Sequence, residues 1–147
     1  MSEPAPLQAF IGEWSVEIAF PGAPPAAVRG HSVFEWMLDG RFLLQRTEIP
    51  IPEAPDSTAI VSPDEDGDGF TQHYFDSRGV VRLYAMMFAD REWTLLRTAP
   101  DFTPLKFSQR FLGTFDEDGG AIRGRWETSP DGAAWEKDFD LTYTRLA

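Results

Sequence analysis

The sequence predicts an all-β fold: a closed, up-and-down antiparallel β-barrel of about ten strands with a short N-terminal helical turn. Turn-forming residues recur at short, even intervals after residue 20. The segments between them have strand length and are rich in aromatic and β-branched residues. No crossover helix is evident. A long twisted sheet avoids exposed edges by pairing its first strand with its last, so we expect a barrel. A two-sheet sandwich is the alternative.

The boundaries of the predicted elements are marked by Asp-Gly, Gly-Gly and Pro-rich steps, which favour tight connections between antiparallel strands. Only the segment from Pro6 to Gly12 has helical character, and a helix there would plug one barrel mouth. The predicted strands span residues 13–20, 27–38, 41–49, 57–62, 69–76, 80–89, 91–99, 106–115, 121–129 and 134–146.

Alternation of apolar and polar residues assigns an inward face to several strands. The clearest apolar faces carry Trp14, Val16, Ile18 and Phe20 in the first strand; Phe107, Phe111 and Phe115 in the eighth; and Trp135, Phe139, Leu141 and Tyr143 in the last. The strand at 80–89 is apolar on both faces, so its inward side stays open.

The length, composition and charge of the chain exclude several classes of protein. A length of 147 residues corresponds to one domain, expected to span 1–147. The 42% apolar and 14% aromatic content excludes a disordered chain. A net charge of −11 argues against nucleic acid and anionic membranes as partners. With no cysteine, disulfides and thiol catalysis are excluded. Neither a long apolar run nor a signal-peptide pattern is present, which predicts a soluble, cytoplasmic protein.

A barrel of this size holds side chains and one small ligand, so inward polar residues are the candidates for function. Arg97, Gln109 and Lys137 share faces with large apolar residues, and Arg46 lies on a face with Phe42 and Leu44. A buried cation requires an anion. That anion is either an internal carboxylate, such as Glu48 for Arg46, or the carboxylate of a ligand, and internal pairing is favoured.

The predicted function is a binding protein that holds a small hydrophobic or amphipathic ligand in the lumen, with anionic ligands among the candidates. The alternatives are an enzyme of isomerase or cyclase type acting on such a ligand, and a solid structural barrel. A homodimer is compatible with the sequence, which defines no interface. The candidate lumen residues are Trp14, Trp36, Arg46, His73, Tyr84, Arg97, Gln109, Trp126, Lys137 and Tyr143.

Catalytic and metal motifs are weak. Glu35, Glu48 and Asp76 are candidate acid–base carboxylates because apolar neighbours raise a carboxyl pKa. For the enzyme alternative, the candidates are Glu48, His73 and Tyr84. Asp76 to Gly79 is simplest as a turn, in which Asp76 bonds the backbone two residues on and Gly79 takes a positive φ.

No metal site or cofactor is predicted. Asp64 to Gly69 matches the first half of a calcium loop, but position twelve, where such a loop needs glutamate, is Phe75. A solvated acidic turn is therefore the preferred interpretation. His31 and His73 are isolated on different strands, without the spacing of a zinc site.

Several segments resemble a bacterial, actinobacterial-type family of unknown function with a lipocalin-like, calycin-type barrel. They are LQAFIGEW (Leu7 to Trp14), WMLDGRFLLQRT (Trp36 to Thr47), HYFDSRGVVRLYAM (His73 to Met86), FSQRFLGTF (Phe107 to Phe115), GRWETSPDG (Gly124 to Gly132) and DFDLTYTR (Asp138 to Arg145). The resemblance implies the same barrel and brings no activity with it. A more distant similarity is to nitrobindin-like heme barrels, whose axial histidine lies late in the chain. The last histidine here is His73.

Overall fold

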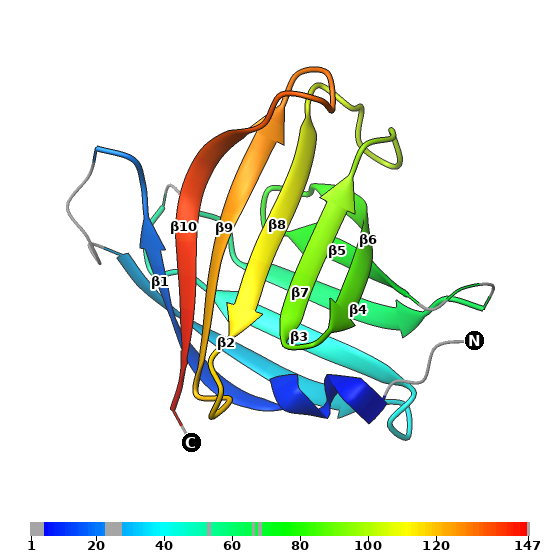
Figure 1. Cartoon of the computed structure of the whole chain (residues 1–147), viewed down its shortest axis with the longest axis vertical. Coiled ribbons are helices and arrows are strands. Elements are labelled where there is room, and N and C mark those ends of the chain that lie inside the picture. Colours follow the sequence, from blue (N-terminus) through cyan, green and yellow to red (C-terminus); the bar gives the residue numbers. More distant parts are fainter. Residues whose placement is uncertain (1–4, 23–27, 53, 66, 68, 147) are drawn as a thin grey trace.

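The computed structural model describes residues 5–22, 28–52, 54–65, 67 and 69–146. In these residues the chain forms one short 3-10 helix and ten strands, which close into a single antiparallel barrel (Figure 1). Every strand pairs with the next one in sequence, and the first pairs with the last. The predicted fold class is confirmed, and the barrel replaces the sandwich alternative.

The helix η1 spans Ala5–Phe10. The strands are β1 (Gly12–Ala19), β2 (Val28–Met37), β3 (Phe42–Glu48), β4 (Ser57–Pro63), β5 (Phe70–Asp76), β6 (Val81–Ala89), β7 (Glu92–Arg97), β8 (Ser108–Phe115), β9 (Ala121–Ser129) and β10 (Glu136–Arg145). All ten predicted strands are present, and their ends differ from the predicted ones by a few residues. Among the described residues, no helix has the length and apolar character needed to cross a bilayer.

The alternation of side chains separates the interior of the barrel from its outer face. Trp14, Val16 and Ile18 of β1 are buried, as predicted from the sequence. In β6 the buried residues are Tyr84 and Met86, so this face of the strand points inward. The structure thereby decides the orientation that the sequence left open.

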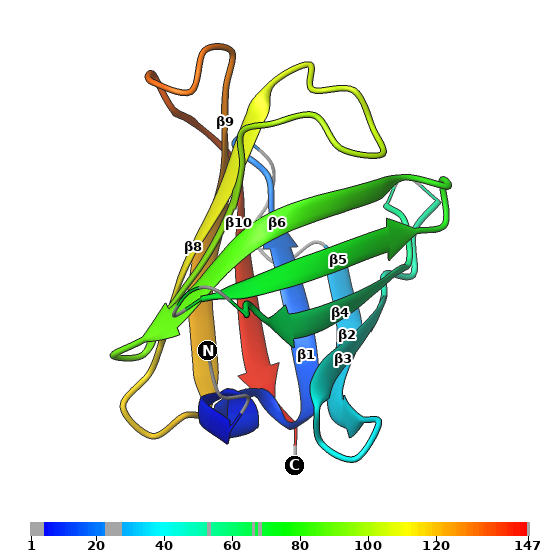
Figure 2. The same ribbon diagram turned by 90° about the vertical axis from the view of Figure 1, so that its right-hand side faces the viewer.

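Helix η1 closes one end of the barrel, beneath the strands in Figures 1 and 2. Leu7 and Phe10 are fully buried there. The Phe10 ring lies 4.9–5.2 Å from the rings of Phe34, Phe88, Trp93 and Phe115, three of them at the edge-on angles that aromatic pairs prefer. The predicted plug at one mouth is therefore confirmed.

Arg145 joins the plug to the seam between the first and last strands. Its guanidinium stacks on the Trp14 ring, 4.1 Å from the ring centroid. The same guanidinium donates to the Ile11 carbonyl at 2.7 Å and to the Ala9 carbonyl at 2.8 Å. The Trp14 indole donates to the Phe10 carbonyl at 2.8 Å. Two side chains that are cross-strand partners thus fix the end of η1.

Two glycines on adjacent strands allow the Phe111 ring to lie across the inner wall. Gly113 and Gly124 are cross-strand partners in β8 and β9. A Cβ at Gly124 would collide with the Phe111 ring, and one at Gly113 would lie 2.7 Å from it. These positions need glycine because of this close approach.

A β-bulge in β10 changes which side chains face inward. Lys137 pairs with Glu127 and Phe139 with Trp126, so Asp138 is the extra residue. An extra residue reverses the alternation. Phe139, Leu141 and Tyr143 therefore follow the predicted inward face, while Trp135 and Lys137, before the bulge, are on the outside.

Replacing Arg145 by Ala is expected to lower the free energy of unfolding by about 2–4 kcal/mol, because it removes charge-assisted hydrogen bonds and a cation–π contact together. Urea unfolding followed by circular dichroism measures this loss. Arg29→Ala is the control, since Arg29 forms an exposed ion pair with Glu17 and should cost under about 1 kcal/mol. Equal losses in the two variants would show that Arg145 does not hold the seam.

Candidate functional site

A cavity of about 410 Å³ occupies the barrel interior at the end opposite η1. Such a volume lies within the roughly 300–1,000 Å³ of small-molecule sites. Around the same end lie the connections between β7 and β8 and between β9 and β10, which extend beyond the strands in Figure 2. The apolar and aromatic lining residues are Val16, Ile18, Phe20, Ile49, Ala54, Pro55, Ala59, Tyr74, Tyr84, Trp93, Leu95, Phe107, Phe111, Trp126, Phe139, Leu141 and Tyr143.

One wall of the cavity is a continuous row of aromatic rings. The Trp126 ring lies 5.5 Å from that of Tyr84 and 5.4 Å from that of Phe111. Phe20 and Phe107 line the cavity while remaining exposed to solvent. Exposed aromatic rings lining a hollow give an apolar molecule surface to cover.

A hydrogen-bonded polar group crosses the lumen between β2, β3 and β10. The Gln45 amide nitrogen lies 3.1 Å from the Ser32 hydroxyl and 3.3 Å from both the Thr47 and the Tyr143 hydroxyls. Burial raises the pKa of Tyr143 to about 12, so its hydroxyl stays protonated. This group therefore contributes polarity to the lumen but no charge.

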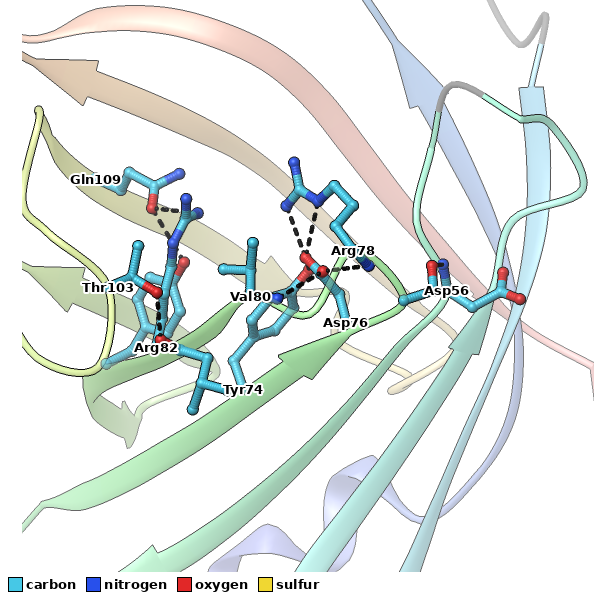
Figure 3. Close-up of polar contacts among 11 residues, drawn as sticks. Asp56, Tyr74, Asp76, Arg78, Val80, Arg82, Thr103 and Gln109 are labelled. Atoms are coloured by element: carbon cyan, nitrogen blue, oxygen red, sulfur yellow. Dashed lines mark hydrogen bonds and ion pairs between the residues drawn. The ribbon is translucent and has the colours of Figure 1, made fainter.

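A second polar group lies on the β5–β6 turn at the cavity edge. The Tyr74 hydroxyl donates to Asp76 at 2.8 Å, and the Arg78 guanidinium donates to the same carboxylate at 2.6 Å (Figure 3). Burial raises the pKa of Asp76, but the hydrogen bonds from Arg78 and Tyr74 outweigh it, and the pKa lies below its usual value. Asp76 also accepts from the Arg78 backbone at 2.9 Å, and Gly79 has a φ of 87°. The predicted turn is confirmed.

A third polar group centres on Arg82. Its Nη1 donates to the Gln109 side-chain oxygen at 3.1 Å, and the Tyr84 hydroxyl donates to that oxygen at the same distance. Figure 3 shows Arg82 and Gln109 directed toward one another from β6 and β8. Arg82 Nε is buried without a hydrogen-bond partner among the described residues. No carboxylate within the part of the chain that the structure describes forms an ion pair with this guanidinium.

Arg97 lies beside this group, but its guanidinium is already bound by residues of the β7–β8 connection. Its guanidinium binds both oxygens of Asp101, at 3.0 and 2.9 Å, and the Thr103 carbonyl at 2.7 Å. Asp101 also accepts from the Leu83 backbone at 2.8 Å. The hydrogen bonds from Arg97 hold the pKa of Asp101 far below its usual value. This ion pair therefore attaches the connection to β6, and Arg97 does not line the cavity.

The structure brings four of the predicted candidates together around the cavity: Tyr84, Gln109, Trp126 and Tyr143. Trp14 and Trp36 lie in the plugged end instead, Trp14 beneath Arg145 and Trp36 donating to Gln8 at 3.1 Å. Whether any of these residues contacts a ligand stays a prediction.

Two of the lumen candidates, Arg46 and His73, lie on the outer face. Arg46 alternates with the cavity residues Gln45 and Thr47 and pairs with Glu35 at 2.9 Å. His73 alternates with the cavity residues Gln72 and Tyr74. His31 is also exposed, beside Glu13. Neither histidine of the chain therefore contributes an imidazole to the cavity lining.

The predicted inward orientation of Lys137 is wrong. Lys137 is half-exposed and pairs with Asp140 at 3.1 Å. Because the bulge at Asp138 reverses the alternation, Lys137 no longer shares the face of Phe139. Trp135 is displaced from the predicted inward face for the same reason, and the Arg110 guanidinium stacks on its ring at 4.2 Å.

Sequence reasoning missed Arg82, the arginine that donates to Gln109 in the cavity. The signal was present: Arg82 and Tyr84 share a face of β6, and Tyr84 was already a lumen candidate. The strand is apolar on both faces, so the sequence does not show which face of β6 points inward or that Arg82 lies on it. Gln45, Gln72, Tyr74 and Arg78 also line the cavity without having been predicted.

The acid–base candidates are largely outside the lumen. Glu48 is exposed, and Glu35 pairs with Arg46 on the outer face. Tyr84 does line the cavity, where burial raises its pKa. Among the described residues there is no group of three or more metal-ligating side chains. Of the acidic turn, Asp66 and Asp68 lie outside the described residues. Asp64 accepts a hydrogen bond from the Thr71 hydroxyl at 2.6 Å.

These features define a closed antiparallel barrel with one plugged end and one hollow end, a fold compatible with ligand binding. The crystal structure of Rv2717c from M. tuberculosis has a similar fold, with a TM-score of 0.63 over 100% of both chains at 15% identity. No protein-family model and no curated protein matches the chain. The similarity shows the fold alone. Membership of the bacterial family stays a prediction, and the link to nitrobindin-like barrels is not shown.

Asp101→Asn is expected to destabilise the protein by about 3–5 kcal/mol at pH 7, since it leaves Arg97 buried without its counter-ion. An unfolded aspartate has a pKa of about 3.9, and that of Asp101 is lowered in the folded state. Its stabilisation is therefore complete above about pH 5 and is lost as the pH falls below about 4.

Urea unfolding of both proteins across a pH series measures this difference. The gap between wild type and Asp101→Asn should narrow in acid. Asp140→Asn, which breaks the exposed pair with Lys137, is the control and should cost under about 1 kcal/mol. A gap that stays constant down to pH 2 would contradict the assignment.

Proposed function

We propose that this protein binds a small, mostly apolar molecule in the barrel lumen. The observation that carries the proposal is the cavity of about 410 Å³, walled by aromatic rings and plugged at one end. A few polar groups, led by Gln45, Arg82 and Gln109, are positioned around it. A concave, largely apolar site with a few convergent polar groups is the usual form of a small-molecule site.

The packing at the two ends supports binding over a solid scaffold. At the plugged end, Leu7, Phe10 and Trp14 are completely buried in contact with one another or with neighbouring rings. At the hollow end, Phe20 and Phe107 are 45% and 38% exposed beside empty space. The same chain thus fills one half of its interior and leaves the other half unfilled, although filling it would bury more apolar surface.

N-phenyl-1-naphthylamine, a neutral probe whose fluorescence rises in apolar surroundings, tests the proposal. The wild-type protein is expected to bind it with micromolar affinity. Ala59 lies in the cavity wall, so Ala59→Phe should weaken binding at least about tenfold by occupying the space, a loss of about 1.4 kcal/mol. A fluorescence titration measures both values.

Thr58→Phe is the matched control, because Thr58 alternates with the cavity residues Ser57 and Ala59 and lies on the outer face. It introduces the same side chain and should leave the dissociation constant within about twofold. Circular dichroism checks that both variants keep the barrel. Binding that survives Ala59→Phe, or is lost equally in Thr58→Phe, would place the probe outside the lumen and refute the proposal.

A further inference from the structure

The three arginines around the cavity differ in how their charge is neutralised. Arg78 is bound by Asp76, and Arg97 is bound by both oxygens of Asp101. Arg82, which lines the cavity between them, has no acidic partner among the described residues. One guanidinium in the lumen wall therefore has no counter-ion among the described residues.

Among the described residues, the side-chain acceptors that bond Arg82 are both neutral: the Gln109 oxygen and the Tyr84 hydroxyl. The Gln109 oxygen accepts from Arg82 Nη1 and also from the Tyr84 hydroxyl, each at 3.1 Å. An amide oxygen used by two donors cannot balance a cation, and the buried Arg82 Nε still lacks an acceptor. Leaving a partly buried charge without a counter-ion and the buried Nε donor without an acceptor is costly, so the arrangement favours an anion supplied from outside the chain.

We propose that Arg82 binds the carboxylate of an amphipathic ligand, whose apolar body lies against the aromatic wall of Phe111 and Trp126. The proposal rests on the proposed function, since it names the chemical class of the ligand in the same cavity. A guanidinium offers several N–H donors in one plane, which matches the two oxygens of a carboxylate. Gln109 then orients the guanidinium and leaves its charge available.

Neither of the carboxylates near the cavity serves as the counter-ion of Arg82. Asp138 lines the cavity at the β10 bulge, but it is exposed to water and forms no ion pair with Arg82. Asp76 already accepts from Arg78 and Tyr74. The aromatic rings beside Arg82 lower the local dielectric constant, and a charge-assisted hydrogen bond is stronger in such surroundings than at the surface.

A matched pair of competitors tests the head group. Decanoate and decanol have the same chain and differ at the end that should meet Arg82. Each is used to displace N-phenyl-1-naphthylamine from wild type and from Arg82→Met, which keeps an unbranched apolar stem and removes the charge. Wild type should bind decanoate at least about tenfold more tightly than decanol, and Arg82→Met should lose this preference.

Arg46→Met is the control variant, since Arg46 is on the outer face and paired with Glu35. It removes the same charge from the protein and should leave the decanoate preference intact. Arg82→Lys should restore part of the preference, because it returns the charge without the planar fork. A preference that persists in Arg82→Met, or that falls equally in Arg46→Met, overturns the proposal.

The neutral probe distinguishes failure of the carboxylate site from failure of lumen binding. If N-phenyl-1-naphthylamine binds wild type and Arg82→Met alike and decanoate has no advantage over decanol, the carboxylate site is wrong while lumen binding stands. If the neutral probe does not bind wild type at all, the proposed function fails and the carboxylate site fails with it.

Stability without ligand provides a second, independent measurement. An arginine kept for an external anion destabilises the empty barrel, so Arg82→Met should raise the melting temperature by a few degrees. Saturating decanoate should raise that of wild type and not that of the variant. A melting temperature lowered by Arg82→Met in the absence of ligand would mark Arg82 as a structural residue and overturn the proposal.

Discussion

Arg145, stacked on Trp14, joins the last strand of the barrel to the first strand and to η1. It lies on the β1–β10 seam, where closure of the barrel depends on pairing the first strand with the last. The hydrogen bonds that Arg145 donates to the Ile11 and Ala9 carbonyls also hold η1 against the end of the barrel. One side chain therefore contributes both to the closure of the sheet and to the closure of one mouth.

Plugging one end divides the interior into two halves with different packing. Near η1 the aromatic rings contact one another directly, with Phe10 within 5.2 Å of four others. Toward the open end the lining includes glutamines, tyrosines and arginines bonded to one another, and a cavity remains. Because buried polar groups must be satisfied, Gln45 and Gln109 each have fixed partners in the empty barrel. The polar groups that line the cavity are therefore held in position by one another.

The strands could be predicted from the sequence because turn residues mark nearly every connection and the apolar faces alternate. The site was harder, since one residue decides the orientation of a whole strand end. The bulge at Asp138 turned Lys137 outward, and no residue type announces a bulge there. In β6, apolar residues on both faces concealed the phase that places Arg82 in the lumen. Partners such as Asp101 for Arg97 come from a connection whose path only the folded chain reveals.

The contrast between Arg82 and Arg97 also bears on how an acidic protein could hold an anion. With a net charge of −11, the long-range field repels anions, but salt screens that field within about 8–10 Å. Recognition then depends on short-range groups in the lumen. Asp101 makes Arg97 part of the wall, whereas the neutral Gln109 leaves the charge of Arg82 uncancelled. A carboxylate at position 109 would pair with Arg82, the one arginine of the described cavity lining that has no acidic partner.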